Sequence, residues 1–166
     1  MMYPQAYLDY LTHFASRDYF ECHEVLEEHW KSEGMENDLW VGLIQLAVGL
    51  YHERRGNHKG ARRMLTSALK KLEQHQSSLQ SLGIDRPRLL SLLKKRVSTY
   101  NEDQLFIDFD LPLEDQILRT HYESSLQPSN LNDDSLIHKH SLRDRSDVIQ
   151  ERLLQQKIRQ QARTLD

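Results

Sequence analysis

Apolar residues recur every three or four positions along most of the first hundred residues, which is the spacing of helices with one buried face. Glycines follow three of these segments, at the places where helices commonly end. The pattern predicts helices over residues 4–15, 19–32, 39–55, 58–81 and 88–100. The third is apolar around most of its circumference, as a central buried helix would be. The sequence therefore predicts an all-α fold, a compact orthogonal bundle of about five helices.

The periodicity changes after residue 100. Residues 106–115, FIDFDLPLED, lack the helical spacing and predict extended chain lying on the bundle, followed by a short helix at about 113–122. Residues 123–145 are polar, with Pro, Ser, Asn and paired Asp, as in linkers. Residues 146–166 again show helical spacing, in an amphipathic pattern. We expect a bundle domain over 1–122, a linker over 123–145 and a C-terminal helix over 146–166.

Composition narrows the class of protein. The 166 residues are 38% hydrophobic, so we expect one domain with a modest core. A net charge of -3 gives no reason to expect a nucleic-acid or membrane-surface partner. Cys22 is alone, the N-terminus lacks the pattern of a signal peptide, and the longest apolar run, 41–51, is too short to span a membrane. These features predict a cytoplasmic protein.

Candidate chemistry is concentrated in the segment YFECHEVLEEHW, residues 19–30. At 100° per residue, His23 and Glu27 share a face with Glu24 beside it, whereas His29 points elsewhere and is expected to be exposed. The next helix carries Gln45 and His52, seven residues apart on one face, and the turn after it carries Asn57. If the two helices are neighbours, these polar side chains converge on one pocket. The side chains expected to converge are His23, Glu24, Glu27, Gln45 and His52.

Two imidazoles with a carboxylate suit a divalent metal such as Zn, Mn or Fe. The candidate metal ligands are His23, Glu27 and His52. Glu24 would accept a proton from a metal-bound water, and Gln45 and Asn57 would orient the substrate. The spacing matches neither the zinc-protease motif nor the repeated Glu-x-x-His motif of di-iron bundles. The predicted activity is that of a metal-dependent hydrolase acting on a small molecule.

A second interpretation stays open. His and Glu side chains on adjacent helices can form a purely structural hydrogen-bond network. The helical pair 39–55 and 58–81 also has the length of one helical-repeat unit, although stable arrays need about three. On this interpretation the chain is a non-enzymatic helical adaptor for a protein partner, and its apolar edges would equally support a homodimer.

The segment YFECHEVLEEHW, with GLIQLAVGLYHERRGNHKGA over residues 42–61, resembles a bacterial all-helical family, domain-of-unknown-function family 309. That family carries the label "predicted metal-dependent hydrolase". The resemblance extends from about Leu8 to Leu72 and does not cover the chain beyond Tyr122. By this resemblance, the positions of the family motif are Tyr19, Phe20, Glu21, His23, Glu24, Glu27, Trp30, Gln45, His52, Asn57 and Gly60.

Overall fold

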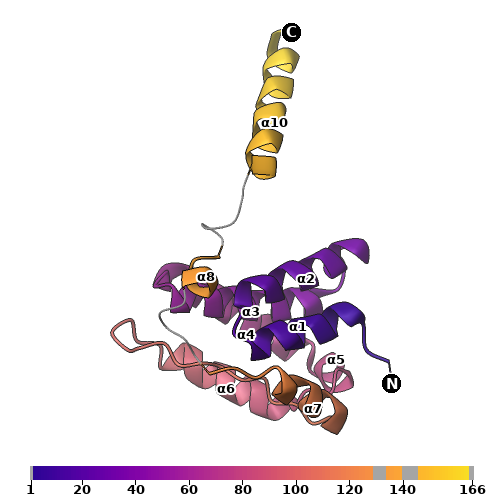
Figure 1. Cartoon of the computed structure of the whole chain (residues 1–166), viewed down its shortest axis with the longest axis vertical. Coiled ribbons are helices and arrows are strands. Elements are labelled where there is room, and N and C mark those ends of the chain that lie inside the picture. Colours follow the sequence, from indigo (N-terminus) through magenta and orange to yellow (C-terminus); the bar gives the residue numbers. More distant parts are fainter. Residues whose placement is uncertain (1, 129–133, 140–145, 165–166) are drawn as a thin grey trace.

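The computed structural model describes residues 2–128, 134–139 and 146–164, and it confirms the all-α fold (Figure 1). Its helices are α1 (Gln5–Ala15), α2 (Tyr19–Ser32), α3 (Asp38–Arg54), α4 (His58–Gln74), α5 (Gln76–Ser81), α6 (Arg86–Ser98), α7 (Gln116–Ser124), α8 (Asp134–Ile137) and α10 (Ser146–Thr164). None of the helices in these ranges is long and apolar enough to cross a membrane.

Side-chain caps determine where several helices begin. Asp18 accepts a hydrogen bond from the Glu21 amide at the start of α2, and Asn57 accepts one from the Gly60 amide at the start of α4. Such caps satisfy amides that have no partner within the helix. The helix expected over 58–81 is divided at His75, where φ is -118° and ψ is 34°. This break gives α5 a direction of its own and lets it bury Leu79.

Helix α3 lies at the centre, packed against α2 on one side and α4 on the other. Leu43, Leu46 and Leu50 are fully buried along it. Two glycines of α3 face α4: a Cβ added at Gly49 would lie 2.7 Å from Leu65, and one added at Gly42 would lie 2.9 Å from Leu72. The absence of side chains there allows the two helices to approach closely.

Residues 105–115, which we call the strap, are extended as expected and run across the bundle from α6 to α7 (Figure 1). Three of its own side chains are buried, those of Phe109, Leu111 and Leu113. Ile84 forms an isolated antiparallel bridge with Leu113, and the Asp85 amide donates to the Pro112 carbonyl. The strap is therefore part of the core, and α7 follows it to Ser124.

The segment expected as a linker includes α8, whose Ile137 is buried. Arg54 donates to the Leu136 carbonyl at 3.0 Å, and Lys139 Nζ lies 2.7 Å from Asp18 Oδ2. Helix α10 points away from the bundle, and its side chains from 152 to 163 are exposed (Figure 1). The division into 1–122, 123–145 and 146–166 stays a prediction.

Candidate functional site

His23 lies on α2, and one of its ring nitrogens is hydrogen-bonded to the backbone of the same helix. The Nδ1 atom lies 2.8 Å from the Phe20 carbonyl oxygen, which can only accept, so Nδ1 carries the proton. The Nε2 atom lies 3.3 Å from Glu27 Oε2 and 3.5 Å from Glu24 Oε1. His23 is therefore oriented with its unprotonated Nε2 atom as the base, and two carboxylates lie beside that atom.

His52, near the end of α3, has the opposite arrangement. Its Nδ1 atom lies 3.2 Å from Arg55 Nε and 3.3 Å from Asn57 Nδ2, and both of these groups are donors. A nitrogen that accepts hydrogen bonds carries no proton, so the neutral His52 ring carries its proton on Nε2. The turn that makes this possible contains Gly56 at φ 87°, a conformation that glycine adopts readily.

The two histidines line the same pocket, which lies between α2 and α3 and has a volume of about 240 Å³. Its walls are mainly aromatic: the Phe20 and Tyr51 ring centroids are 5.5 Å apart, and the Arg55 guanidinium lies 5.6 Å from the Tyr51 centroid. The volume is close to the lower end of the range for small-molecule sites, about 300–1,000 Å³. We call it the α2–α3 pocket; its lining residues are Tyr19, Phe20, His23, Val48, Tyr51, His52 and Arg55.

The other predicted residues lie around this pocket but do not line it. Glu24 and Glu27 contact His23 from the outer side of α2. Asn57 caps α4 while contacting His52. Gln45 is on α3, and its Oε1 atom is buried without a hydrogen-bond partner among the described residues.

The three predicted metal ligands are only partly brought together. His23 Nε2 and Glu27 Oε2 are 3.3 Å apart, close to the separation of two ligands that bind one tetrahedral Zn²⁺ at ~2.0–2.2 Å. His52 does not fit this set, because its Nδ1 atom accepts hydrogen bonds and the cationic Arg55 is beside it. Within the described residues no three His, Cys, Asp or Glu side chains are placed to hold a metal. The metal role of His23, Glu27 and His52 stays a prediction.

His29 differs from the expectation of an exposed residue. Its side chain is 21% exposed, its Nε2 atom lies 3.0 Å from Glu33 Oε1, and its ring centroid lies 5.4 Å from that of Trp40 with the two rings nearly perpendicular. Sequence reasoning also missed Tyr51 and Arg55 as pocket residues. A signal for both was present, since each is within three or four residues of Val48 or His52 on the same helical face.

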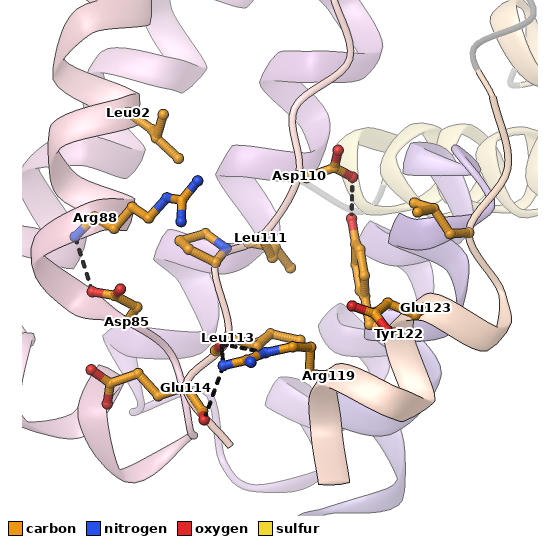
Figure 2. Close-up of a pocket in the computed structure, with 12 residues that line it drawn as sticks. Asp85, Arg88, Leu92, Asp110, Leu111, Leu113, Glu114, Arg119, Tyr122 and Glu123 are labelled. Atoms are coloured by element: carbon orange, nitrogen blue, oxygen red, sulfur yellow. Dashed lines mark hydrogen bonds between the residues drawn. The ribbon is translucent and has the colours of Figure 1, made fainter. Parts of the chain in front are cut away.

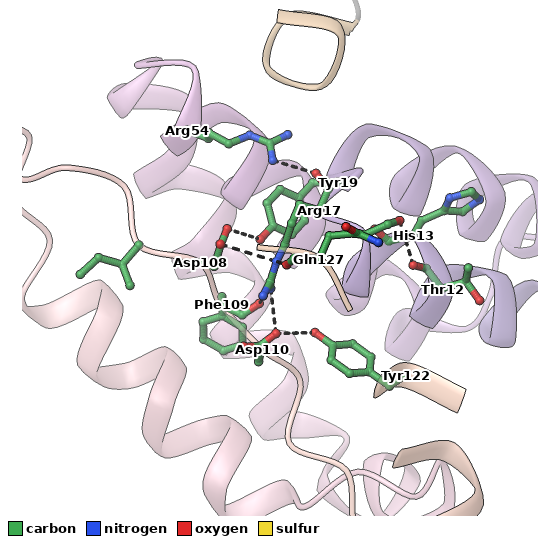
Figure 3. Close-up of polar contacts among 12 residues, drawn as sticks. Thr12, His13, Arg17, Tyr19, Arg54, Asp108, Phe109, Asp110, Tyr122 and Gln127 are labelled. Atoms are coloured by element: carbon green, nitrogen blue, oxygen red, sulfur yellow. Dashed lines mark hydrogen bonds and ion pairs between the residues drawn. The ribbon is translucent and has the colours of Figure 1, made fainter. Parts of the chain in front are cut away.

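A buried polar cluster next to the site belongs to the fold (Figure 3). Arg17 Nη1 donates to Asp110 Oδ1 at 2.7 Å, and Tyr122 donates to the same oxygen at 2.7 Å. Burial alone would lower the pKa of Arg17, but the hydrogen bond to Asp110 and the negative charges around the guanidinium together outweigh burial and raise that pKa. Tyr19 donates to Asp108 at 3.3 Å, and burial raises the pKa of its hydroxyl well above the ordinary value. This cluster connects the strap to the start of α2.

A larger hollow of about 660 Å³ lies between α6, the strap and α7 (Figure 2). Its polar groups mainly bind the backbone or one another. Arg119 donates to the Leu113 and Glu114 carbonyls, and Tyr122 donates to Asp110. The α2–α3 pocket is smaller but holds two histidines of opposite tautomer, so it is the better candidate for chemistry.

The comparisons with known proteins match the part of the chain that forms the α2–α3 pocket. The family model Domain of unknown function (DUF309) matches residues 7–64, which span α1, α2, α3 and the start of α4. The chain is also 43% identical over 162 residues to the uncharacterized protein YpuF of Bacillus subtilis (strain 168), covering 91% of this chain and 93% of that protein. No solved structure matches. The helices that form the α2–α3 pocket lie within the region that the family model matches, and this chain belongs to family DUF309.

Proposed function

We propose that this protein binds a small organic ester or related acyl compound in the α2–α3 pocket and hydrolyses it. The observation that carries the proposal is the pairing of His23, protonated on Nδ1, with His52, protonated on Nε2, in one aromatic pocket. One imidazole is a base and the other is a donor, and hydrolysis of a carbonyl compound needs both.

The residues have distinct roles in this proposal. Phe20 and Tyr51 would contact a flat or apolar part of the ligand. His23 Nε2 would take a proton from the attacking water, and Glu27 would stabilise the resulting imidazolium. The imidazolium would then return this proton to the leaving alkoxide as the acyl C–O bond breaks. His52 and Arg55 would donate to the carbonyl oxygen as negative charge develops on it. Asn57 then acts indirectly, by keeping His52 in its tautomer.

The test uses p-nitrophenyl acetate as the probe, because it joins a flat ring to an ester. We compare the wild-type protein with His23→Asn and with His29→Asn. The matched control is close, because His29 is on the same helix and pairs with Glu33 four residues on, as His23 pairs with Glu27, but does not line the pocket. We expect kcat/KM to fall at least tenfold in His23→Asn and to change little in His29→Asn. Equal rates in all three proteins would contradict the proposal.

The same assay distinguishes a metal-dependent hydrolase from a metal-free one. The wild-type protein and His52→Asn are each measured with a chelator present and then with Zn²⁺ or Mn²⁺ added. Loss of wild-type turnover on chelation, recovered by metal only while His52 is intact, would support His23, Glu27 and His52 as metal ligands. Turnover that is unaffected by the chelator would support the metal-free roles given above.

The adaptor interpretation is favoured by a different observation. Leu153, Leu154 and Ile158 of α10 are about half exposed, at 53%, 52% and 49%. Exposed apolar stripes on a helix mark interaction surfaces. If p-nitrophenyl acetate turnover is absent and a bound protein is lost on removal of residues 146–166, the adaptor interpretation replaces the hydrolase.

A further inference from the structure

Helix α10 carries two separate stripes. Leu154 and Ile158, four residues apart, form an apolar stripe, and Arg152, Arg159 and Arg163 form a basic one. At 100° per residue the centres of the two stripes are about 140° apart around the helix. Between residues 152 and 163 all the charged side chains are basic. A helix of this kind packs best where an apolar groove has an acidic wall on one side.

The bundle has such a place beside α2. The apolar wall of the α2–α3 pocket includes Phe20, Val48 and Tyr51. Proceeding around α2 away from the pocket, Phe20 is followed by Lys31, which pairs with Glu27, and then by Glu24 and the exposed Glu28. The acidic flank therefore lies beside the apolar groove, on the neighbouring side of α2.

The chain that leads to α10 is already held at this flank. Lys139 Nζ lies 2.7 Å from Asp18 Oδ2 and 3.3 Å from Glu21 Oε1, and these contacts raise the pKa of the lysine although burial opposes them. Ile137 is buried nearby. A basic residue of the C-terminal region thus pairs with the acidic N-terminal end of α2.

Chain length permits α10 to follow the same direction. The residues between Lys139 and Ser146 span at most about 24 Å when extended. Helix α2 is 14 residues long, or about 21 Å, and the 19 residues of α10 are about 28 Å long. Arg152 and Arg159 are seven residues apart, as are Glu21 and Glu28. If α10 lies parallel to α2, Arg152 and Arg159 can therefore face Glu21 and Glu28.

We propose that α10 docks on the α2–α3 face of its own chain, with Leu154 and Ile158 over the pocket and its arginines on the acidic flank of α2. In this docked position α10 would cover the pocket, whereas in Figure 1 it lies away from the bundle. The docking surface stands on the contacts above, whereas its role as a cover for a ligand site rests on the proposed function.

The test measures the distance between spin labels in the full chain carrying Glu36→Cys and Gln160→Cys, both of which are exposed positions. The native Cys22 is buried, and burial raises the pKa of its thiol, so it does not compete for label. At low salt we expect a narrow distance distribution within the length of α2. At 0.5 M salt, where charges are screened beyond ~4 Å, we expect it to broaden and lengthen.

Charge reversals identify the surface. Arg152→Glu with Arg159→Glu should abolish the short distance, whereas Lys157→Glu, on another side of the same helix, should retain it. Glu28→Lys should partly restore the short distance in the Arg159→Glu protein. A long, broad distribution at every salt concentration would overturn the proposal. So would equal effects of Lys157→Glu and the arginine reversals, or a short distance that disappears when labelled chain is diluted with unlabelled chain, which indicates docking between two copies. None of these readouts depends on ligand or turnover, so failure of the hydrolase proposal leaves them unchanged.

Discussion

Tyr3 ties the first residues of the chain to the cap of α7. Its hydroxyl donates to Asp115 Oδ2 at 2.6 Å, while Asp115 Oδ1 accepts from the Ile117 amide. Partial burial and this hydrogen bond raise the pKa of Tyr3 to about 12. The same bond lowers the pKa of Asp115. One contact between two side chains therefore affects stability at both ends of the pH scale.

Replacing Tyr3 by Phe should flatten both ends of the stability curve. A tyrosine pKa raised from 10.0 to about 12 gives stability that is present below pH 10 and is lost as pH rises toward 12. The lowered pKa of Asp115 gives stability that is lost as pH falls below the ordinary carboxyl range. Urea unfolding at a series of pH values measures both slopes.

Tyr100→Phe is the matched control for this prediction. Burial raises the pKa of Tyr100 to about 12 as well, but its hydroxyl is paired with His58 at 2.6 Å. This variant should flatten the alkaline slope and leave the acid slope unchanged. An acid slope that changes equally in both variants would contradict the assignment to the Tyr3–Asp115 contact.

The residues that the sequence predicts well are those whose partners are close in the chain. Asp18, with Glu21 three residues on, has the side chain and the position of a helix cap, and it caps α2. The side of the ring on which His52 is protonated depends on the path of the turn through Gly56, which places Arg55 and Asn57 against Nδ1. Spacing alone gives no access to that orientation, so a metal-ligand role and a donor role look alike in the sequence.

At the scale of elements, the contact between α3 and α4 is determined by two glycines. A Cβ at Gly49 would lie 3.2 Å from the backbone nitrogen of Leu65 as well as 2.7 Å from its side chain. A Cβ at Gly42 would meet side-chain atoms alone, with Leu72 Cδ2 at 2.9 Å. Side-chain ends can shift, whereas the backbone of α4 moves only if the whole helix does.

We therefore expect Gly49→Ala to lower the free energy of unfolding by about 1–3 kcal/mol through overpacking. This loss should exceed the gain of about 1 kcal/mol that alanine brings to a helix interior. Gly42→Ala, in the same helix, should change stability by less than about 1 kcal/mol. Urea denaturation of the two variants makes the comparison. A larger loss in Gly42→Ala than in Gly49→Ala would contradict this description of the interface.

Helix periodicity identified the main helices because each buries one continuous face. It did not identify the break at His75, which depends on where α5 finds space for Leu79. Nor did it identify α8, a single turn that contains Leu136 and precedes Lys139, which contact Arg54 and Asp18, far away in the chain. Short elements held by distant partners leave little periodic signal.

At the scale of the whole molecule, two truncations test where the folded unit ends. A chain ending at Pro128 loses the burial of Ile137 and the pairing of Lys139 with Asp18, whereas one ending at Lys139 keeps both. Measured at 0.5 M salt, we expect the shorter chain to be less stable by about 1.5–3 kcal/mol, the value of one buried aliphatic side chain. The chain ending at Lys139 should match the full chain. Equal stability of both truncations would limit the folded unit to the bundle expected from the sequence.

The strap also has consequences for the order in which the chain folds. Arg17 reaches Asp110, and the Gln127 amide donates to the Ala15 carbonyl, so these contacts close loops of about a hundred residues. The entropy of closing such a loop must be overcome before its contacts give any return, whereas α2, α3 and α4 meet through short connections. The α2–α3 pocket can therefore form on a nucleus of three local helices, with the strap joining last. In hydrogen exchange from the native state, the amides of the strap and α7 would exchange as a separate unit, while those of α2 and α3 stay protected.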